Sequence, residues 1–432
     1  MWLTYDEDLE VEIKQAHEEG RDVPWLEDEA RVVLAMDEYA HGREALAGAL
    51  LDRVRKAPLK AGYPYEEPDA LADIQAARPK PWRNETRAYD REAMRDRVLG
   101  AWLGRCAGCL LGKPVECMKR SEVYPMLHGT DNYPLNRYMS ADPRYGLSAD
   151  RAWIDKVTEM PEDDDTNYTI VSLGLLEHFG RDFTPANVRY AWMGALPILH
   201  VCTAERVAYR NFTAGMMPPE SAMYRNPYRE WIGAQIRTDF YGYINPGNPQ
   251  LAAEYAWRDA CVSHTKNGIY GAMFVAAMLS EAALCADAEA IIRTGLSQIP
   301  EKSRLSEAVR DVLTWRGQNV SWEAALERIH NRYDENDKHD WCHTVPNALI
   351  VCLGLLYGDM DFERSVGLAV TAMFDTDCNG ATVGSILGIA LGAAKLPDKW
   401  TAPLNNRLSS GVYGFASMEI SALAERTMKF IS

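Results

Sequence analysis

The sequence predicts an all-α protein, because helical spacing of apolar residues recurs along the chain whereas strand-like alternation is sparse. The ranges 269–284 and 348–357 are nearly all apolar, which is typical of helices buried on most sides. Between residues 45 and 54, four apolar residues share one helical face: Leu46, Leu50, Leu51 and Val54. The 432 residues are enough for one large domain or two average ones.

Amino-acid composition and net charge indicate a globular protein and disfavour several functional classes. The chain is 47% hydrophobic and 25% charged, as in ordinary globular proteins. Its formal net charge of −16 disfavours nucleic-acid binding, because an acidic surface repels phosphates. The N-terminus shows no secretory pattern, and the longest apolar stretch, 380–394, is short for a membrane span. Nine cysteines follow no paired framework, so we expect a cytoplasmic protein with reduced thiols and no membrane contact.

The first 90 residues differ from the rest of the chain. They are acidic and poor in glycine, and the range 58–83 is rich in proline, alanine and charge. We therefore expect residues 1–90 to form an N-terminal helical extension or arm, and residues 91–432 to form the catalytic domain. A loop-rich region is expected at 211–250, where a long irregular segment within a compact domain is often functional.

Two segments carry a glycine at every fourth residue: Gly100, Gly104, Gly108 and Gly112, and Gly380, Gly384, Gly388 and Gly392. Residues i and i+4 share a helix face, so each set forms a smooth groove. A helical glycine costs about 1 kcal/mol relative to alanine, and close packing of both helices against neighbours would compensate. A membrane dimer is the alternative, but Arg105 and Lys113 argue against it. Cys106 and Cys109 form a CxxC without further zinc ligands nearby, which fits two small residues on one helix face.

Two runs of acidic residues precede apolar helical segments: Glu162, Asp163, Asp164, Asp165 and Thr166, and Asp375, Thr376, Asp377, Cys378 and Asn379. Helix capping explains one or two acids in each run, since aspartate at a helix start favours the helix dipole. Further adjacent carboxylates repel one another unless cations neutralise them. Mg²⁺, Ca²⁺ and Mn²⁺ prefer such oxygen ligands, and two ions can share bridging carboxylates. On spacing alone, capping and a metal site are equally good interpretations.

Four short stretches, in order, resemble the ADP-ribosylglycohydrolase family, which includes dinitrogenase reductase-activating glycohydrolases, ADP-ribosyl hydrolases and J1 crystallins. They are residues 100–104 with 111–116, residues 163–166, residues 233–237 with 263–264, and residues 375–378. The resemblance spans residues 97–400 and implies a compact, multi-helix all-α domain. It also implies two Mg²⁺ (or Mn²⁺) ions held by Asp163, Asp164, Asp165, Asp375, Asp377 and Cys378.

The resemblance further implies roles in catalysis and substrate binding. Glu116 matches the family's glutamate and is a candidate general acid/base, with Asp164 or Asp165 as the alternative base. The substrate-binding candidates are Gly233, Gln235 and Arg237 for the diphosphate, His264 beside the adenosine and phosphate part, and Tyr243 for stacking on a base. Simpler interpretations are a surface acid for Glu116, a core histidine for His264 and turn packing for Tyr243.

Two positions depart from the family's pattern, because Asp163 and Cys378 stand where the family has threonine. Asp163 adds negative charge, whereas the soft sulfur of Cys378 is a poor Mg²⁺ ligand, so Cys378 lies outside the shell, Asn379 replaces it, or the second ion binds differently. The expected function is hydrolysis of an N- or O-glycosidic bond to ribose, foremost removal of ADP-ribose from a protein or small molecule.

Three alternatives to this function are open. The first is a nucleoside or other riboside hydrolase on the same scaffold, and the second is a non-catalytic, crystallin-like protein. The third is a phosphatase of the haloacid dehalogenase type, suggested by the apolar range 368–374 before Asp375 and Asp377. That phosphatase motif belongs near the start of an α/β domain, whereas here it lies close to the end of the chain.

Overall fold

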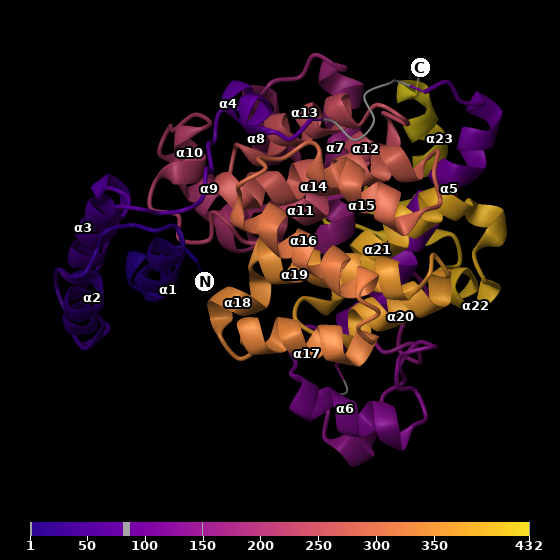
Figure 1. The fold of residues 1–432 in the computed structure, drawn as a ribbon, viewed down its shortest axis with the longest axis horizontal. Helices are drawn as coiled ribbons and strands as arrows, with labels where there is room; N and C mark the ends of the chain where they lie inside the picture. The colour runs from indigo at the N-terminus through magenta and orange to yellow at the C-terminus, as the bar shows by residue number, and fades with distance from the viewer. Residues whose placement is uncertain (1, 81–86, 149, 432) are drawn as a thin grey trace.

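The computed structural model describes residues 2–80, 87–148 and 150–431, and it confirms the all-α class (Figure 1). The described residues form 23 α-helices and one short antiparallel ribbon of β1 (Arg407–Ser409) and β2 (Ser417–Glu419). The apolar ranges noted in the sequence are α14 (Lys266–Ala282) and α19 (Thr344–Tyr357), and every residue of α19 is buried. Within the described residues, no helix combines the length and the apolarity needed to cross a membrane.

The centre of the molecule is a pair of glycine-faced helices, α5 (Arg91–Gly112) and α21 (Thr376–Leu391). A Cβ added at Gly104 would lie 2.1 Å from the carbonyl oxygen of Gly384, so the two backbones touch directly. The hydroxyl of Thr376 donates to the carbonyl oxygen of Gly112 at 2.9 Å, which joins the start of α21 to the end of α5. The expected close packing is confirmed, and the two glycine faces are each other's partners.

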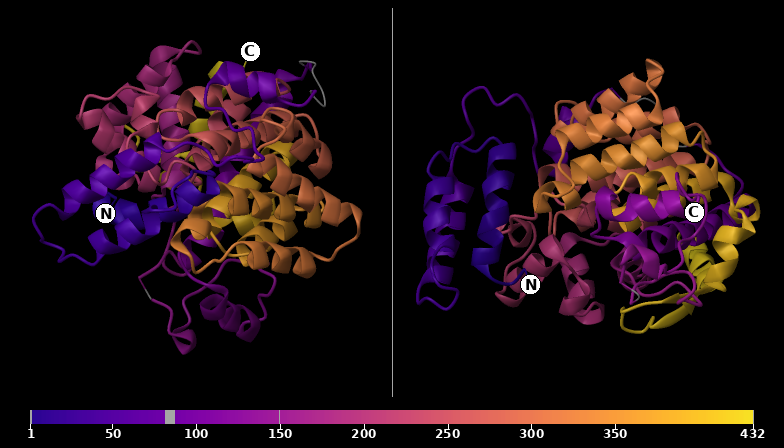
Figure 2. Two further views of the ribbon diagram at one scale, coloured as in Figure 1. Left: turned by 60° about the vertical axis from the view of Figure 1, so that its left-hand side comes forward. Right: turned by 90° about the horizontal axis from the view of Figure 1, so that it is seen from below.

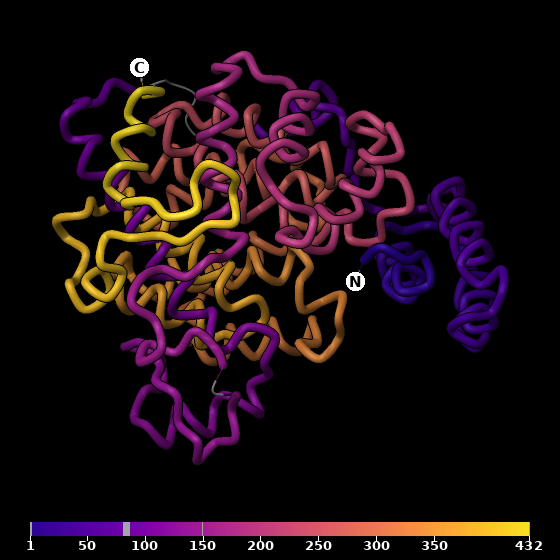
Figure 3. The backbone as a smooth tube through the Cα atoms, turned by 180° about the vertical axis from the view of Figure 1, so that it is seen from behind, coloured from indigo at the N-terminus to yellow at the C-terminus, as the bar shows by residue number. Residues whose placement is uncertain are grey.

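The other helices of the body pack around this pair (Figures 1 and 3). Around α14 lie α11 (Gly233–Arg237), α12 (Asp239–Tyr243), α13 (Pro249–Ala260) and α15 (Ala288–Leu296). Around α19 lie α16 (Arg304–Gly317), α17 (Trp322–Arg332), α18 (Lys338–Cys342) and α20 (Phe362–Thr371). The remaining helices of the body are α6 (Arg120–Gly129), α7 (Asp164–Phe179), α8 (Pro185–Ala195), α9 (Thr203–Thr213), α10 (Glu220–Met223), α22 (Asp398–Thr401) and α23 (Ile420–Thr427).

The range 211–250 is more regular and more deeply buried than the sequence suggested. It contains α10, α11 and α12, which have four or five residues each, and residues 230–247 are all buried. Helices this short complete little more than one turn, so their apolar residues cannot display a helical period. The range therefore belongs largely to the core and is not an exposed loop.

The N-terminal arm consists of α1 (Tyr5–Glu18), α2 (Leu26–Leu34) and α3 (Arg43–Lys56), followed by α4 (Leu71–Ala77) on the body. The first three helices share an apolar core of their own, separate from the main core. Figure 2 shows α2 and α3 projecting from the molecule, with α1 between them and the body. N-terminal helices ahead of the main domain are thus confirmed, while the boundary at residue 90 stays a prediction.

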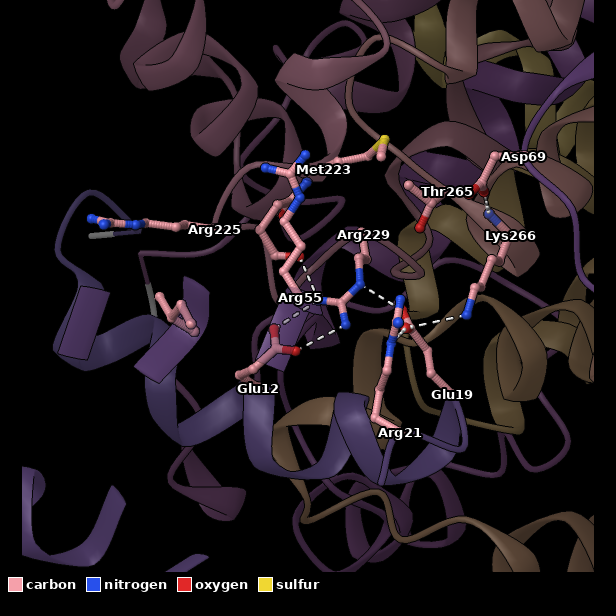
Figure 4. A pocket seen from close by; sticks show the side chains of 12 residues that line it. Glu12, Glu19, Arg21, Arg55, Asp69, Met223, Arg225, Arg229, Thr265 and Lys266 are labelled. Carbon is pink, nitrogen blue, oxygen red and sulfur yellow. Dashed lines mark hydrogen bonds and ion pairs between the residues drawn. The ribbon is translucent and has the colours of Figure 1, made fainter. Parts of the chain in front are cut away.

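Buried ion pairs attach α1 to the body (Figure 4). Glu12 and Glu19 both accept hydrogen bonds from Arg229, at 2.7 and 2.5 Å. Lys266 lies 3.2 Å from Glu19, and Asp8 pairs with Arg210 at 2.9 Å. Burying a carboxylate without such a partner costs free energy, so these ion pairs fix the position at which α1 docks on the body.

Candidate metal centre

The first acidic run begins α7. Asp163 is the N-cap residue, and its Oδ1 accepts a hydrogen bond from the backbone N–H of Asp165 at 2.9 Å. The hydroxyl of Thr166 donates to the carbonyl oxygen of Asp163 at 3.1 Å, so this threonine braces the turn. Capping therefore accounts for one oxygen of Asp163 but for no other carboxylate of the run.

The second acidic run begins α21 in a different way. Asp375 occupies the N-cap position, but its side chain caps no backbone N–H. Its own backbone N–H donates to Oδ1 of Asn347 at 3.1 Å, and the side-chain amide of Asn379 donates to the same oxygen at 2.8 Å. The Cys342 thiol lies 3.6 Å from Oδ2 of Asp375. Asp375 and Asp377 are both buried, although capping does not require either side chain.

The fold brings the two acidic runs together. The side-chain ligand atoms of Cys109, Asp163, Asp165 and Asp377 lie within 4.8 Å of one another. Asp375, Asp377 and Cys378 form a second group within the same limit. Asp377 belongs to both groups, so the arrangement offers a carboxylate that bridges two adjacent sites, as binuclear centres require.

Crowding raises the pKa values of most of these carboxyl groups, because burial and neighbouring negative charges disfavour ionisation. Burial and the charge of Asp163 raise the pKa of Asp377 to about 6. The charge of Asp377, followed by burial, raises the pKa of Glu116 well above its ordinary value. Burial likewise raises the pKa values of three further groups: Asp164, Asp165 and Asp375. Without added cations, the folded protein must hold protons here.

The centre contains two cationic side chains. The Lys113 ammonium lies 2.5 Å from Oδ2 of Asp163. Burial raises the pKa of Asp163, but the charge of Lys113 together with hydrogen bonds from Lys113, the Asp165 backbone N–H and Cys109 lowers it overall. Arg105 is fully buried and divides its guanidinium between Asp165, at 3.0 Å, and Asp239, at 2.7 Å. These two cations are fewer than the clustered carboxyl groups, so negative charge is left uncompensated.

Unpaired oxygens show where further cations fit. Among the described residues, Oδ2 of Asp165 and Oδ1 of Asp377 are buried and have no hydrogen-bond partner. A buried carboxylate oxygen without a partner is costly, and a divalent cation relieves that cost directly. Carboxylate oxygens are also the ligands that Mg²⁺ and Mn²⁺ prefer. The residues present therefore fit a centre for hard divalent cations.

The cysteines of the centre are weaker candidates as ligands. Burial raises the pKa values of the Cys109 and Cys378 thiols well above their ordinary values, so both are neutral thiols. A neutral thiol is a poor ligand for a hard cation. Sequence reasoning missed the position of Cys109, although Arg105, Cys109 and Lys113 recur every fourth residue and so share one face of α5.

Comparison with known proteins places this centre in a family. Residues 90–430 match the family model described as ADP-ribosylglycohydrolase. The chain belongs to the ADP-ribosylglycohydrolase family. A search of curated proteins finds no match. A solved structure, described as an ADP-ribosylglycohydrolase-related protein complex, is similar at 20% identity and a TM-score of 0.48, covering 79% of this chain and 100% of that one.

Membership of the ADP-ribosylglycohydrolase family confirms the resemblance found in the four motifs. The matched range contains both acidic runs, whereas residues 2–80 of the arm lie before it. The phosphatase alternative required a strand ahead of Asp375. The structure places α20 there instead, ending at Thr371, so that alternative is wrong.

The residues expected to bind the diphosphate lie inside the ADP-ribosylglycohydrolase domain. All five residues of α11 are buried, and a Cβ added at Gly233 would lie 2.1 Å from Oε1 of Glu205. Both side-chain polar atoms of Gln235 are buried without a hydrogen-bond partner. Arg237 pairs with Glu205 at 2.6 Å and also with Asp259.

His264 and Tyr243 are also buried. Burial lowers the pKa of His264 well below its ordinary value, so its ring is neutral, and Nδ1 lies 2.8 Å from the Ser263 hydroxyl. The Tyr243 hydroxyl bonds to Ser385, and its ring packs against Trp102 at 6.1 Å between centroids. The expected substrate-binding residues are therefore all buried. Glu116, in contrast, lies close enough to Asp377, Asp163 and Asp164 for their charges to raise its pKa, which places it beside the acidic centre.

A third group with metal-ligand composition lies where α1 meets the ADP-ribosylglycohydrolase domain: Glu18, His339 and His343. Trp231 Nε1 donates to Nδ1 of His339 at 3.1 Å, and the backbone N–H of Val345 donates to Nδ1 of His343 at 3.1 Å. Because Nδ1 of each ring accepts a hydrogen bond, its Nε2 carries a hydrogen and offers no lone pair to a metal. Nε2 of His339 lies at hydrogen-bond distance from Oε2 of Glu18, 3.3 Å, whereas Nε2 of His343 lies 3.8 Å from that oxygen and 3.6 Å from Oε2 of Glu230. This group therefore joins the end of α1 to the domain.

Proposed function

We propose that this ADP-ribosylglycohydrolase hydrolyses an N- or O-glycosidic bond to ribose with two Mg²⁺ or Mn²⁺ ions, foremost releasing ADP-ribose from a modified protein or small molecule. The observation that carries the proposal is the pair of acidic groups sharing Asp377, with buried carboxylate oxygens that lack partners. The ions would be held by Asp163, Asp164, Asp165, Asp375 and Asp377, with Cys378 at the edge. When bound, they supply positive charge that orients the ribose hydroxyls.

The chain's own carboxyl groups would move the protons. Glu116 and Asp164 are only partly buried, unlike the other acids of the centre. In the protein without bound cations, the charge of Asp377 and burial raise the pKa of Glu116. We assign Glu116 to donating a proton to the leaving atom, because it is the partly buried carboxyl group beside the proposed metal ligands. The bond between the anomeric carbon and that atom breaks, water adds to the carbon, and Asp164 or Asp165 accepts the proton that the water loses.

The buried charged residues around α11 would influence the reaction by shifting the pKa values of the acidic centre. Arg237 contacts Glu205, and the charge of Glu205 contributes to the raised pKa of Asp164. The Tyr243 hydroxyl bonds to Ser385 and lies near Asp239, the partner of Arg105. Direct contact of Gly233, Gln235, Arg237, Tyr243 and His264 with substrate stays a prediction.

A substrate panel tests the proposal. Release of ADP-ribose from arginine-, serine- and small-molecule-linked substrates is compared with release of ribose from simple nucleosides, with Mg²⁺, with Mn²⁺ and with EDTA. We expect cation-dependent release of ADP-ribose, and its loss in Asp377→Asn. The matched control is Asp28→Asn, which removes an exposed carboxylate in the arm.

Three results would decide against the proposal. Preferential release of ribose from nucleosides would favour the riboside-hydrolase alternative. No turnover of any riboside, together with no thermal shift on adding Mg²⁺, would favour a non-catalytic protein. Activity that survives Asp377→Asn would show that the metal ligands are assigned wrongly.

A further inference from the structure

An aromatic pocket lies between the N-terminal arm and the ADP-ribosylglycohydrolase domain. Its volume is about 560 Å³, within the range of roughly 300–1,000 Å³ that is usual for small-molecule sites. The arm contributes Trp2 and Val11 to its lining, and the domain contributes Trp231 and Trp341. Two parts of the chain that are far apart in sequence thus form one apolar cavity.

The pocket adjoins the acidic centre at two points. Cys117 lines the pocket and directly follows Glu116, with its thiol 3.9 Å from Oε1 of that residue. Trp341 also lines the pocket, and its Nε1 donates at 3.0 Å to the carbonyl oxygen of Phe374, the residue before Asp375. A ligand in the pocket therefore lies beside the carboxyl group that we assign to protonating the leaving group.

Trp2 extends from this pocket towards the Asp164 side of the centre. Its ring centroid lies 5.0 Å from the guanidinium of Arg206 in α9. Both Arg206 and Asp164 act electrostatically on Cys202, which places that part of α9 beside the first acidic run. The backbone N–H of Trp2 donates to Oε2 of Glu7 at 3.0 Å, and its φ of +56° is unusual for an L-residue. The indole of Trp2 thus lines the pocket and also contacts Arg206.

The charged residues of the pocket are bonded to protein groups, which leaves ring faces as its recognition surface. Glu10 of α1 pairs with Lys338 at 3.0 Å across the junction, and both line the pocket. The Lys119 ammonium donates to the carbonyl oxygen of Glu335 and lies 6.0 Å from the centroid of the Trp341 ring. Indole faces stack on flat rings and attract cationic ones.

We propose that this pocket binds a planar heteroaromatic leaving group, so that the substrate is a small molecule whose ribose carries such a ring on its anomeric carbon. The inference rests on the proposed function and narrows its substrate class. The cavity of about 560 Å³ has room for a pyridine or nucleobase ring, and Glu7, Glu10 and Val11 of α1 line one side of it. Because Trp2 and α1 lie outside the family match, the restriction belongs to the arm.

The test compares two ligands that differ by one flat ring. Oxidised nicotinamide adenine dinucleotide is ADP-ribose with a pyridinium ring on the anomeric carbon, and ADP-ribose lacks that ring. Isothermal titration with Mg²⁺ measures both affinities in the wild type, Trp2→Ala, Trp2→Phe and Tyr39→Ala. Tyr39 is the matched control, because it is an arm aromatic that is 87% exposed. Chromatography of each mixture measures hydrolysis separately.

We expect the wild type and Tyr39→Ala to bind the dinucleotide about tenfold more tightly than ADP-ribose, the usual scale of stacking on one aromatic side chain. Trp2→Ala should abolish that preference without changing the affinity for ADP-ribose, and Trp2→Phe should retain most of it. Equal affinities in the wild type, an unchanged preference in Trp2→Ala, or equal weakening of both ligands would each overturn the pocket assignment. A retained preference without hydrolysis of any substrate would count against the proposed function alone.

Discussion

Replacing Gly104 by alanine tests whether backbone contact between α5 and α21 holds the molecule together. The new Cβ would lie 2.1 Å from the carbonyl oxygen of Gly384, and ordinary contacts begin near 3.4 Å, so the helices must separate by about 1 Å. The obstacle is backbone and cannot rotate away. Overpacking costs about 1–3 kcal/mol, and the upper end applies here because a backbone oxygen is in the way. The helix-propensity gain of alanine, about 1 kcal/mol, offsets part of that cost. We expect a net loss of about 2 kcal/mol in the free energy of unfolding.

Urea denaturation followed by circular dichroism measures this loss. The matched control is Gly194→Ala in α8, where an added Cβ meets nothing within 4 Å and where alanine should stabilise by up to about 1 kcal/mol. The denaturation midpoint should therefore fall in Gly104→Ala and rise slightly in Gly194→Ala. Equal midpoints in the two variants would refute the reasoning, because the clash would then be absorbed without cost.

Three further predictions concern charge. Arg105→Met should lower the free energy of unfolding by about 3–5 kcal/mol, since it leaves Asp165 and Asp239 buried without their cation; a urea midpoint equal to the wild type's would contradict this. In EDTA, the free energy of unfolding should fall as pH rises from about 4 through 6, because folded Asp377, with its pKa raised from 3.8 to about 6, holds a proton that the unfolded chain has lost. Added Mg²⁺ should remove this fall. Urea midpoints that rise with pH in EDTA would contradict the prediction. Glu18→Gln should speed proteolytic cleavage within residues 58–80 several-fold by weakening the junction with His339 and His343, and exposed Glu27→Gln should not.

The features that sequence predicts well here are those with local signatures. Helical periodicity and the scarcity of strand patterns predict the all-α class, and the glycine spacing predicts two close-packed helices. The acidic runs at 163–165 and 375–377 make capping and a metal site equally good interpretations, and the structure places both runs in buried groups that could hold a metal. Each of these inferences depends on residues within a few turns of one another.

The features that sequence did not predict arise from tertiary contact. Cys109 joins the acidic centre because α5 packs on α21, and nothing within its CxxC indicates that neighbour. Arg237 and Tyr243 match a ligand-binding pattern, yet their partners are buried protein groups more than 20 residues away in the chain. The pocket wall formed by Trp2 likewise depends on where α1 docks, which is set by pairs such as Glu12 with Arg229.

The pairing of α5 with α21 also governs when the protein can fold. The contact from Thr376 to Gly112 spans 264 residues, so the glycine face of α5 leaves the ribosome long before its partner exists. At about 5–20 residues per second, that delay is on the order of 10–50 s. The acidic centre can form only after residues 375–377 have been made, so nascent chains that stop before residue 376 should bind chaperones and be degraded.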